Sequence, residues 1–221
     1  MNGILIVNKQ KGYTSHDLVN KVKRICKEKV GHTGTLDPMA TGVIPLLIGE
    51  ATKLSKYLIE HDKEYEVVLQ LGIKTDTADI EGTVIERKQV TDEVLQKETI
   101  EDALQSFLGK QKQLPPMYSA IKINGKKLYE YARQGRQVEI PQREIEIYQI
   151  KLQNINKEEK NISFIVHCSK GTYIRSLCED IAQKLQTVRL YERTKTNKSR
   201  KILIKRCYYY RRNWKSWRNR G

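Results

Sequence analysis

A loop near the amino terminus holds the residue best suited to do chemistry. Residues 31–38 read Gly-His-Thr-Gly-Thr-Leu-Asp-Pro, and the two glycines and the proline disfavour a helix. Asp37 therefore lies in an irregular segment, and loops between rigid elements often carry functional side chains. An Asp-Pro pair can also be a simple turn former, so Asp37 by itself does not decide a function.

A second constellation combines an aromatic ring and a guanidinium at the start of a helix. Residues 170–175 read Lys-Gly-Thr-Tyr-Ile-Arg, and an amphipathic pattern follows them. Arg175 in the first helical turn opposes the helix dipole, which invites an anion such as a carboxylate or a phosphate. The alternative is an ordinary solvated arginine.

Other residues give weaker signals. His32 could stack on a nucleobase or have no role, and Tyr65 alternates onto a strand face where it could be part of the core. Basic residues interleave with tyrosines between positions 118 and 136, a composition that suits RNA backbone and base contacts but also a solvated face. These residues are Lys122, Lys126, Lys127, Arg133 and Arg136, with Tyr118, Tyr129 and Tyr131.

The elements that position these residues follow from the apolar periodicity. Strands are predicted at residues 3–7, 43–48, 63–71, 82–87, 144–152 and 162–168. Helices are predicted at residues 17–27, 51–59, 99–108, 127–133 and 173–185. Thr14 or Ser15 can cap the first helix, with Leu18, Val22 and Ile25 facing inward. Helices and strands without regular alternation predict an α+β fold, with a largely antiparallel mixed sheet flanked by helices.

Composition excludes several classes of protein. The chain has 221 residues, 38% of them apolar, and lacks any apolar stretch near the roughly 20 residues of a membrane span. Its apolar start is short and has no basic residue before it, so we expect neither signal peptide nor membrane anchor. The four cysteines form no CxxC pair, which predicts no zinc site or disulfide framework and favours a reducing cytoplasm. Phosphate-loop, HExxH and GxSxG motifs are also missing.

The formal charge of +15 is concentrated at the carboxyl end. Residues 189–221 hold 13 of the 41 Lys and Arg residues and one acid, a net +12, which leaves +3 for residues 1–188. The composition therefore changes abruptly near residue 188.

Taken together, the motifs resemble those of a known family. Residues 31–43, Gly-His-Thr-Gly-Thr-Leu-Asp-Pro-Met-Ala-Thr-Gly-Val, closely resemble the catalytic motif of the TruB family of pseudouridine synthases, bacterial enzymes that modify the T-loop uridine at tRNA position 55. Further matches follow in the family's order. They are residues 63–65, Gly72 with residues 75–79, residues 115–122 and residues 169–177. The resemblance runs from about residue 2 to residue 188.

The resemblance implies a catalytic fold, a reaction and a set of roles. The reaction breaks the glycosidic bond of a uridine, rotates the base and rejoins it through carbon, with no metal or other cofactor. Asp37 would be the catalytic carboxylate, Arg175 its ion-pair partner and Tyr65 a stacking residue and base. His32, Tyr173 and Lys9 would contact the substrate. Gln10 stands where the family usually has proline.

The same resemblance implies a cytoplasmic monomer whose partner is the T stem-loop of tRNA. The competing interpretation is a non-catalytic module that binds or folds a T loop, and it needs no carboxylate paired with an arginine. A third interpretation is a glycoside hydrolase with two carboxylates, for which Asp76 and Asp79 are available.

Beyond Val188 the family's pattern stops. One choice of codons for residues 189–202, read one base later, gives Gly-Tyr-Met-Lys-Glu-Leu-Lys-Arg-Thr-Lys-Val-Gly-Lys, which resembles the missing segment. We therefore expect residues 1–188 to be the catalytic domain and residues 189–221 to be an aberrant basic tail from a frameshift, largely unfolded. The family's small carboxy-terminal RNA-binding domain would then be absent. The alternative is a genuine basic RNA-binding tail.

Overall fold

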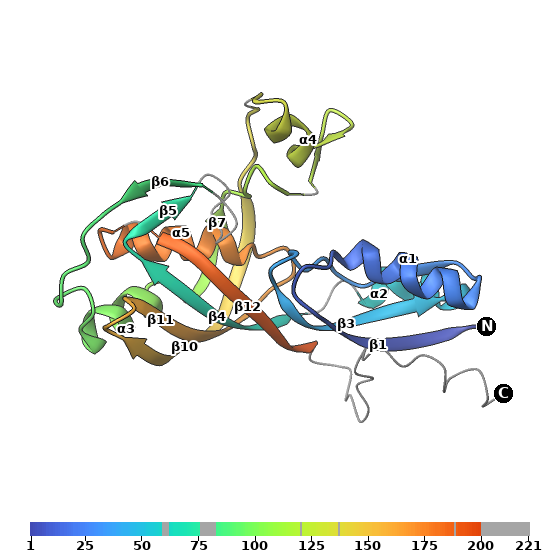
Figure 1. The fold of residues 1–221 in the computed structure, drawn as a ribbon, viewed down its shortest axis with the longest axis horizontal. Helices are drawn as coiled ribbons and strands as arrows, with labels where there is room; N and C mark the ends of the chain where they lie inside the picture. Colours follow the sequence, from blue (N-terminus) through green and yellow to red (C-terminus); the bar gives the residue numbers. More distant parts are fainter. Residues whose placement is uncertain (59–61, 76–82, 120, 137, 188, 200–221) are drawn as a thin grey trace. The chain divides into compact units, whose positions relative to one another are not determined.

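The computed structural model describes residues 1–58, 62–75, 83–119, 121–136, 138–187 and 189–199, the last range by its backbone only. The chain divides into two compact units. Residues 1–64, with residues from 194 onward, form the first unit, and residues 65–193 form the second. The helices and strands of both units are drawn in Figure 1.

Strand β3 (Thr41–Ile48) is the centre of the first unit. It pairs antiparallel with β1 (Gly3–Lys9) and with β2 (Val30–His32). The register sets Lys9 opposite Gly42 and His32 opposite Leu46. Both predicted substrate contacts of this unit therefore lie on strands that pair with the strand following the Asp37 loop.

Helix α1 (Ser15–Cys26) begins with a capping box. The Asp17 N–H donates to Thr14 Oγ1 (3.0 Å), and the Thr14 N–H donates to Asp17 Oδ2 (2.8 Å). The cap predicted from sequence is therefore Thr14, and α1 packs on the sheet through a small apolar cluster. That cluster consists of Val7, Leu18, Val19, Val22, Ile44, Leu46 and Ile48, with Leu5, Cys26 and Val30 against it.

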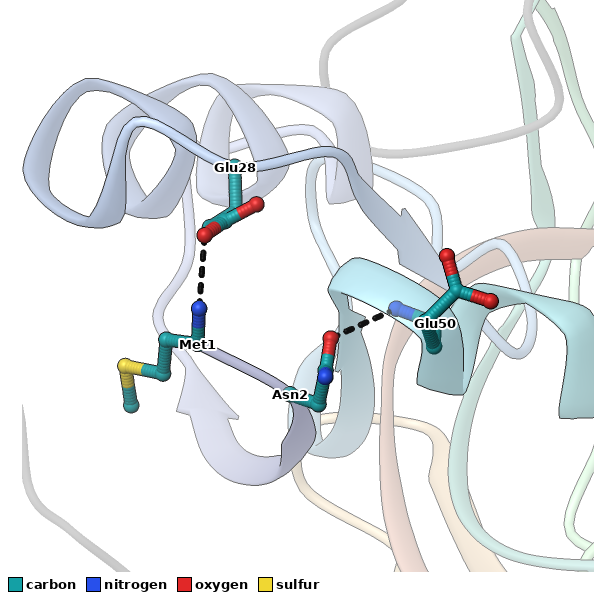
Figure 2. Close-up of polar contacts among 4 residues, drawn as sticks. All are labelled: Met1, Asn2, Glu28 and Glu50. Carbon is teal, nitrogen blue, oxygen red and sulfur yellow. Dashed lines mark hydrogen bonds and ion pairs between the residues drawn. The ribbon is translucent and has the colours of Figure 1, made fainter.

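The amino terminus is tied to the turns that follow α1 and β3, as Figure 2 shows. The Met1 ammonium pairs with Glu28 at 2.6 Å, and the Glu50 N–H donates to Asn2 Oδ1 at 2.8 Å. Between them Gly49 has a φ of +61°, and a Cβ there would lie 2.6 Å from the Met1 carbonyl oxygen. The close approach requires glycine. The 3-10 helix η1 (Gly49–Leu54) and α2 (Ser55–Leu58) complete this edge.

The second unit contains a sheet in the order β4, β11, β10, β7. Its strands are β4 (Lys63–Leu71), β7 (Gly109–Gln113), β10 (Arg143–Asn156) and β11 (Asn161–Cys168). The β10/β11 and β10/β7 pairs are antiparallel. In β4, Val67 and Leu69 are fully buried and Tyr65 packs against the same core, so the predicted alternation is confirmed.

Two helices supply the rest of this core. Helix α3 (Lys97–Gln105) buries Ile100 and Leu104, and α5 (Ile174–Lys184) buries Leu177 and Ile181. Smaller elements complete the unit. They are the pair β5 (Ile73–Thr75) and β6 (Val84–Arg87), the hairpin β8 (Lys122–Ile123) and β9 (Lys126–Lys127), and α4 (Leu128–Arg133). The α+β prediction is confirmed, with helices against a largely antiparallel sheet.

The beginning of the basic tail corrects one expectation. Residues 189–199 form strand β12 (Arg189–Ser199), which pairs in parallel with β3 at Lys195 and Thr196. This stretch is therefore not unfolded. Strand pairing uses main-chain N–H and C=O groups, so it does not require the apolar periodicity that the segment lacks. Within the described part of the chain, no helix is long and apolar enough to cross a membrane.

Candidate active site

The loop that carries Asp37 is anchored on both sides of that residue. Leu36 and Met39 are buried, at 9% and 3% exposure, while Asp37 itself is half-buried. The Leu36 N–H donates to Ser15 Oγ at 2.9 Å, and the Ala40 N–H donates to the Asp37 carbonyl at 3.0 Å. The backbone on either side is thus fixed, and the carboxylate projects from a rigid base.

Lys9 anchors the same loop from beneath. Its side chain is fully buried, and Nζ donates to the carbonyl oxygens of Gln10 (3.2 Å), Tyr13 (2.7 Å) and Pro38 (3.1 Å). Burial lowers the pKa of Lys9 from 10.5 to about 8, and the charges of Asp37 and Asp17 act in the opposite direction.

This environment does not fit the direct substrate contact expected of Lys9. An ammonium group has three N–H donors, and three carbonyls of the protein occupy them. Lys9 instead holds Pro38, the neighbour of Asp37, against the turn that follows β1. Its effect on the carboxylate is electrostatic and positional.

His32 ends strand β2, just before the Asp37 loop. Burial lowers its pKa, and the His16 charge lowers it further, while the Gly34 backbone raises it. The imidazole is therefore held in its neutral form near neutral pH. Its Nδ1 is buried and has no hydrogen-bond partner among the described residues.

Arg175 lies in the first turn of α5, as the sequence indicated, but it is not a solvated residue. It is 9% exposed, and Nη2 donates to the Tyr118 carbonyl at 2.8 Å. A buried guanidinium at the positive end of a helix is costly unless anionic or carbonyl oxygens surround it. The surface-arginine interpretation is therefore wrong.

Tyr173 is the residue before α5, and its main chain is held by Gln113. The Tyr173 N–H donates to Gln113 Oε1 at 2.8 Å, and Gln113 Nε2 donates to the Tyr173 carbonyl at 3.1 Å. Ser176 Oγ donates to the Leu114 carbonyl at 2.8 Å, which adds a second tie between the same two segments. Sequence reasoning missed Gln113, whose only signal is a polar side chain at the end of a strand.

Tyr65 lies on β4 in the second unit. It is half-buried and packs against the main apolar cluster, so part of its ring serves the core as the sequence allowed. Asp37, Lys9 and His32 belong to the first unit, while Tyr65, Tyr173 and Arg175 belong to the second. Asp76 and Asp79, on which the glycosidase interpretation depends, lie outside the described residues.

The basic segment at residues 122–136 forms the β8/β9 hairpin and α4. Lys122, Lys126 and Arg133 are exposed. The Tyr129 ring contacts two cations, with Lys127 Nζ at 5.3 Å and Arg133 Cζ at 5.4 Å from its centroid. Exposed cations around an aromatic ring are suited to phosphate and base contacts.

Comparisons with known proteins agree with this site. The model of the family described as "TruB family pseudouridylate synthase (N terminal domain)" matches residues 23–174. The "tRNA pseudouridine synthase B" of Oceanobacillus iheyensis is 50% identical over 200 residues, which cover 89% of this chain and 66% of that protein. The Alkaliphilus oremlandii protein of the same name is 52% identical over 186 residues, 84% of this chain and 60% of that one.

A solved structure, titled "Crystal Structure of a Cbf5-Nop10-Gar1 Complex", has a similar fold. Its matching chain superposes with a TM-score of 0.66 and 28% identity, and the match covers 89% of this chain and 48% of that one. The chain described here thus spans about two thirds or less of the length of these relatives.

Proposed function

Because this chain belongs to the TruB family of pseudouridylate synthases, we propose that it isomerises the T-loop uridine at position 55 of tRNA to pseudouridine. The observation that carries the proposal is the Asp37 loop, where a half-exposed carboxylate stands on a backbone fixed from both sides. A family match alone would not supply a rigid nucleophile or base.

The reaction conserves every atom of the uridine. The bond from ribose C1′ to uracil N1 breaks, the base rotates within the site, and a bond forms between C1′ and C5. The proton on C5 leaves, and N1 gains one, so the step needs no oxidant, reductant or energy source. Asp37 acts by attack on the ribose carbon or the uracil ring, or as a base at the ribose.

The other residues take supporting roles in the proposal. Arg175 pairs with Asp37 and keeps it ionised, since a buried guanidinium seeks an anion. Tyr65 stacks on the flipped uracil and acts as the base that removes the C5 proton, and Tyr173 lines the same pocket. Neutral His32 fills the space that the flipped base vacates. Lys9 holds the loop and does not touch the RNA.

The basic segment at residues 122–136 supplies the electrostatic part of RNA binding. Its exposed cations bind phosphates of the T stem-loop, and affinity therefore falls as salt rises. We place the protein in the cytoplasm as a monomer, in keeping with the free thiols of Cys26, Cys168 and Cys178.

We also propose that residues 1–188 are the catalytic domain and that residues 189–221 come from a one-base frameshift. The abrupt rise in charge near residue 188 supports this origin. Sequencing the DNA across codons 180–222 tests it. A single inserted or deleted base relative to the coding frame is the expected result, and an intact frame throughout would contradict it.

The activity is tested with a T stem-loop RNA that carries tritium on C5 of uridine 55. Isomerisation releases this hydrogen to water, so we expect release in proportion to pseudouridine formed. The matched control carries the label on C5 of a stem uridine, which should retain it. Tight binding without any release would instead identify a non-catalytic T-loop module and overturn the proposal.

A further inference from the structure

The amide of Gln113 makes a reciprocal pair with the main chain of Tyr173. Gln113 is the last residue of β7 and is 3% exposed. Its Oε1 accepts from the Tyr173 N–H at 2.8 Å, and its Nε2 donates to the Tyr173 carbonyl at 3.1 Å. A primary amide thereby pairs with both polar groups of one residue, sixty positions along the chain.

This pair fixes the entrance to α5. Tyr173 has an extended backbone, with φ −94° and ψ 108°, and no side chain caps the helix there. Its carbonyl also accepts the Leu177 N–H at 3.0 Å, the first bond of the helix. Gln113 therefore determines the angle at which the Tyr173 backbone turns into the helical turn that contains Arg175.

Two further bonds tie the segment after Gln113 to the same turn. Ser176 Oγ donates to the Leu114 carbonyl, and Arg175 Nη2 donates to the Tyr118 carbonyl, both at 2.8 Å. Gln113 is the first of these ties and the one that acts on a backbone. Its removal would leave a buried N–H and a carbonyl with one fewer partner.

We infer that Gln113 is a positioning residue for the isomerisation: by holding the Tyr173 main chain, it sets the directions of the Tyr173 and Arg175 side chains toward the uridine. The inference rests on the proposed function. Only an amide provides one donor and one acceptor in a plane that matches a peptide. Glutamate at this position would keep the bond to the N–H but turn a second lone pair toward the Tyr173 carbonyl.

The test uses the full chain with three substitutions. Gln113→Glu keeps the shape and loses one bond, Gln113→Met loses both, and Gln111→Met is the matched control. Gln111 lies two residues earlier on β7, and its Nε2 donates to the Phe107 carbonyl at 2.6 Å, away from α5. The readouts are kcat and KM on T stem-loop RNA, and hydrogen exchange of peptides that contain Tyr173.

We expect kcat to fall on the order of 10²-fold in both Gln113 variants at pH 7.5, with KM changed by less than about twofold. The Gln113→Glu rate, divided by the parent rate at the same pH, should recover toward pH 5, because a protonated carboxyl can donate to the Tyr173 carbonyl. Gln111→Met should keep the parent kcat. A tie that serves stability alone would lower the melting temperature without this pH-dependent recovery.

The outcomes separate this inference from the proposed function. If the parent turns over and both Gln113 variants keep kcat within about twofold, the positioning role is wrong while the function stands. If the parent does not turn over, the function fails, and exchange then decides the placement of Tyr173. Faster exchange at residues 172–175 in Gln113→Met, but not in Gln111→Met, supports the backbone clamp, and unchanged exchange overturns it.

Discussion

Two regions of the molecule hold a charged side chain in place by different chemistry. Beneath Asp37, the ammonium of Lys9 donates to three main-chain carbonyls. Before Arg175, the neutral amide of Gln113 pairs with a single peptide. The first anchor is a buried cation and the second carries no charge. A cationic anchor stabilises a nearby anion but responds to pH, whereas an amide anchor supplies direction alone and does not titrate.

The difference matches what each region has to hold. The Lys9 charge lies near the Asp37 carboxylate, which raises the lysine pKa against the effect of burial. A second cation beside Arg175 would repel it, so a neutral anchor is the suitable choice there. The following predictions test the contrast, from the largest effect to the smallest.

Lys9→Met should weaken the first region most. It leaves three carbonyls without their buried donor, so we expect the free energy of unfolding to fall by about 3 kcal/mol. Turnover should fall with it, because Pro38 loses a bond beside Asp37. Chemical denaturation measures the stability. Lys11→Met, at an exposed position two residues on, is the control and should change it by less than about 0.5 kcal/mol. Equal stabilities of the two variants would contradict the anchor.

Arg175→Lys tests the second region through its charged residue. Lysine keeps the charge but loses the planar fork, and the loss of one hydrogen bond to a charged group costs about 1.5–3 kcal/mol. Turnover should therefore fall roughly 10- to 100-fold. Single-turnover rates on the T stem-loop measure this. Arg87→Lys, at an exposed position on β6, is the control. A rate within twofold of the parent would refute the pairing role of Arg175.

The pH dependence distinguishes the two anchors. The Lys9 pKa is about 8 in the folded chain and near 10.5 when unfolded, so the unfolded state binds more protons between these values. Stability from this group therefore rises with pH, by about 1 kcal/mol from pH 7 to 9. The parent should gain this amount relative to Lys9→Met, while Gln113→Met should follow the parent. A flat difference between parent and Lys9→Met would mean that Lys9 does not titrate there.

Deletion of residues 200–221 should have the smallest effect. If this segment is frameshifted sequence, turnover and salt dependence of RNA binding should stay within about twofold of the parent. Deletion from residue 189 should do more harm, because β12 pairs with Thr41 and Gly42 directly after the Asp37 loop. Restoring the frame should raise both the melting temperature and the rate. A large, salt-sensitive loss of RNA affinity on removing residues 200–221 would show a working basic tail instead.

Local sequence patterns predicted most of the elements and the positions of the candidate residues. The alternation in β4 and the Thr14 cap depend on neighbours along the chain, and both appear in the structure. The inward face of α1 was partly wrong. Ile25 is 47% exposed, and Cys26 packs inward instead, because the buried row runs 18, 22, 26 and not 18, 22, 25. Both spacings fit one helical face.

The anchors could not be predicted in this way. Lys9 reaches Pro38 across 29 positions, and Gln113 reaches Tyr173 across 60. No periodic pattern in either segment specifies such a partner. A lysine beside a turn and a glutamine at a strand end are usually solvated, and only the fold shows that both are buried.

The most direct test of the proposed catalysis is the turnover of Asp37→Asn on the T stem-loop. This change keeps the shape of the side chain and removes its charge. The dissociation constant for the RNA, measured alongside the rate of tritium release, shows whether binding survives. The account predicts a rate lower by at least about 10²-fold, with the dissociation constant within about threefold of the parent. A variant that binds equally well and still turns over within tenfold of the parent would contradict the role of Asp37.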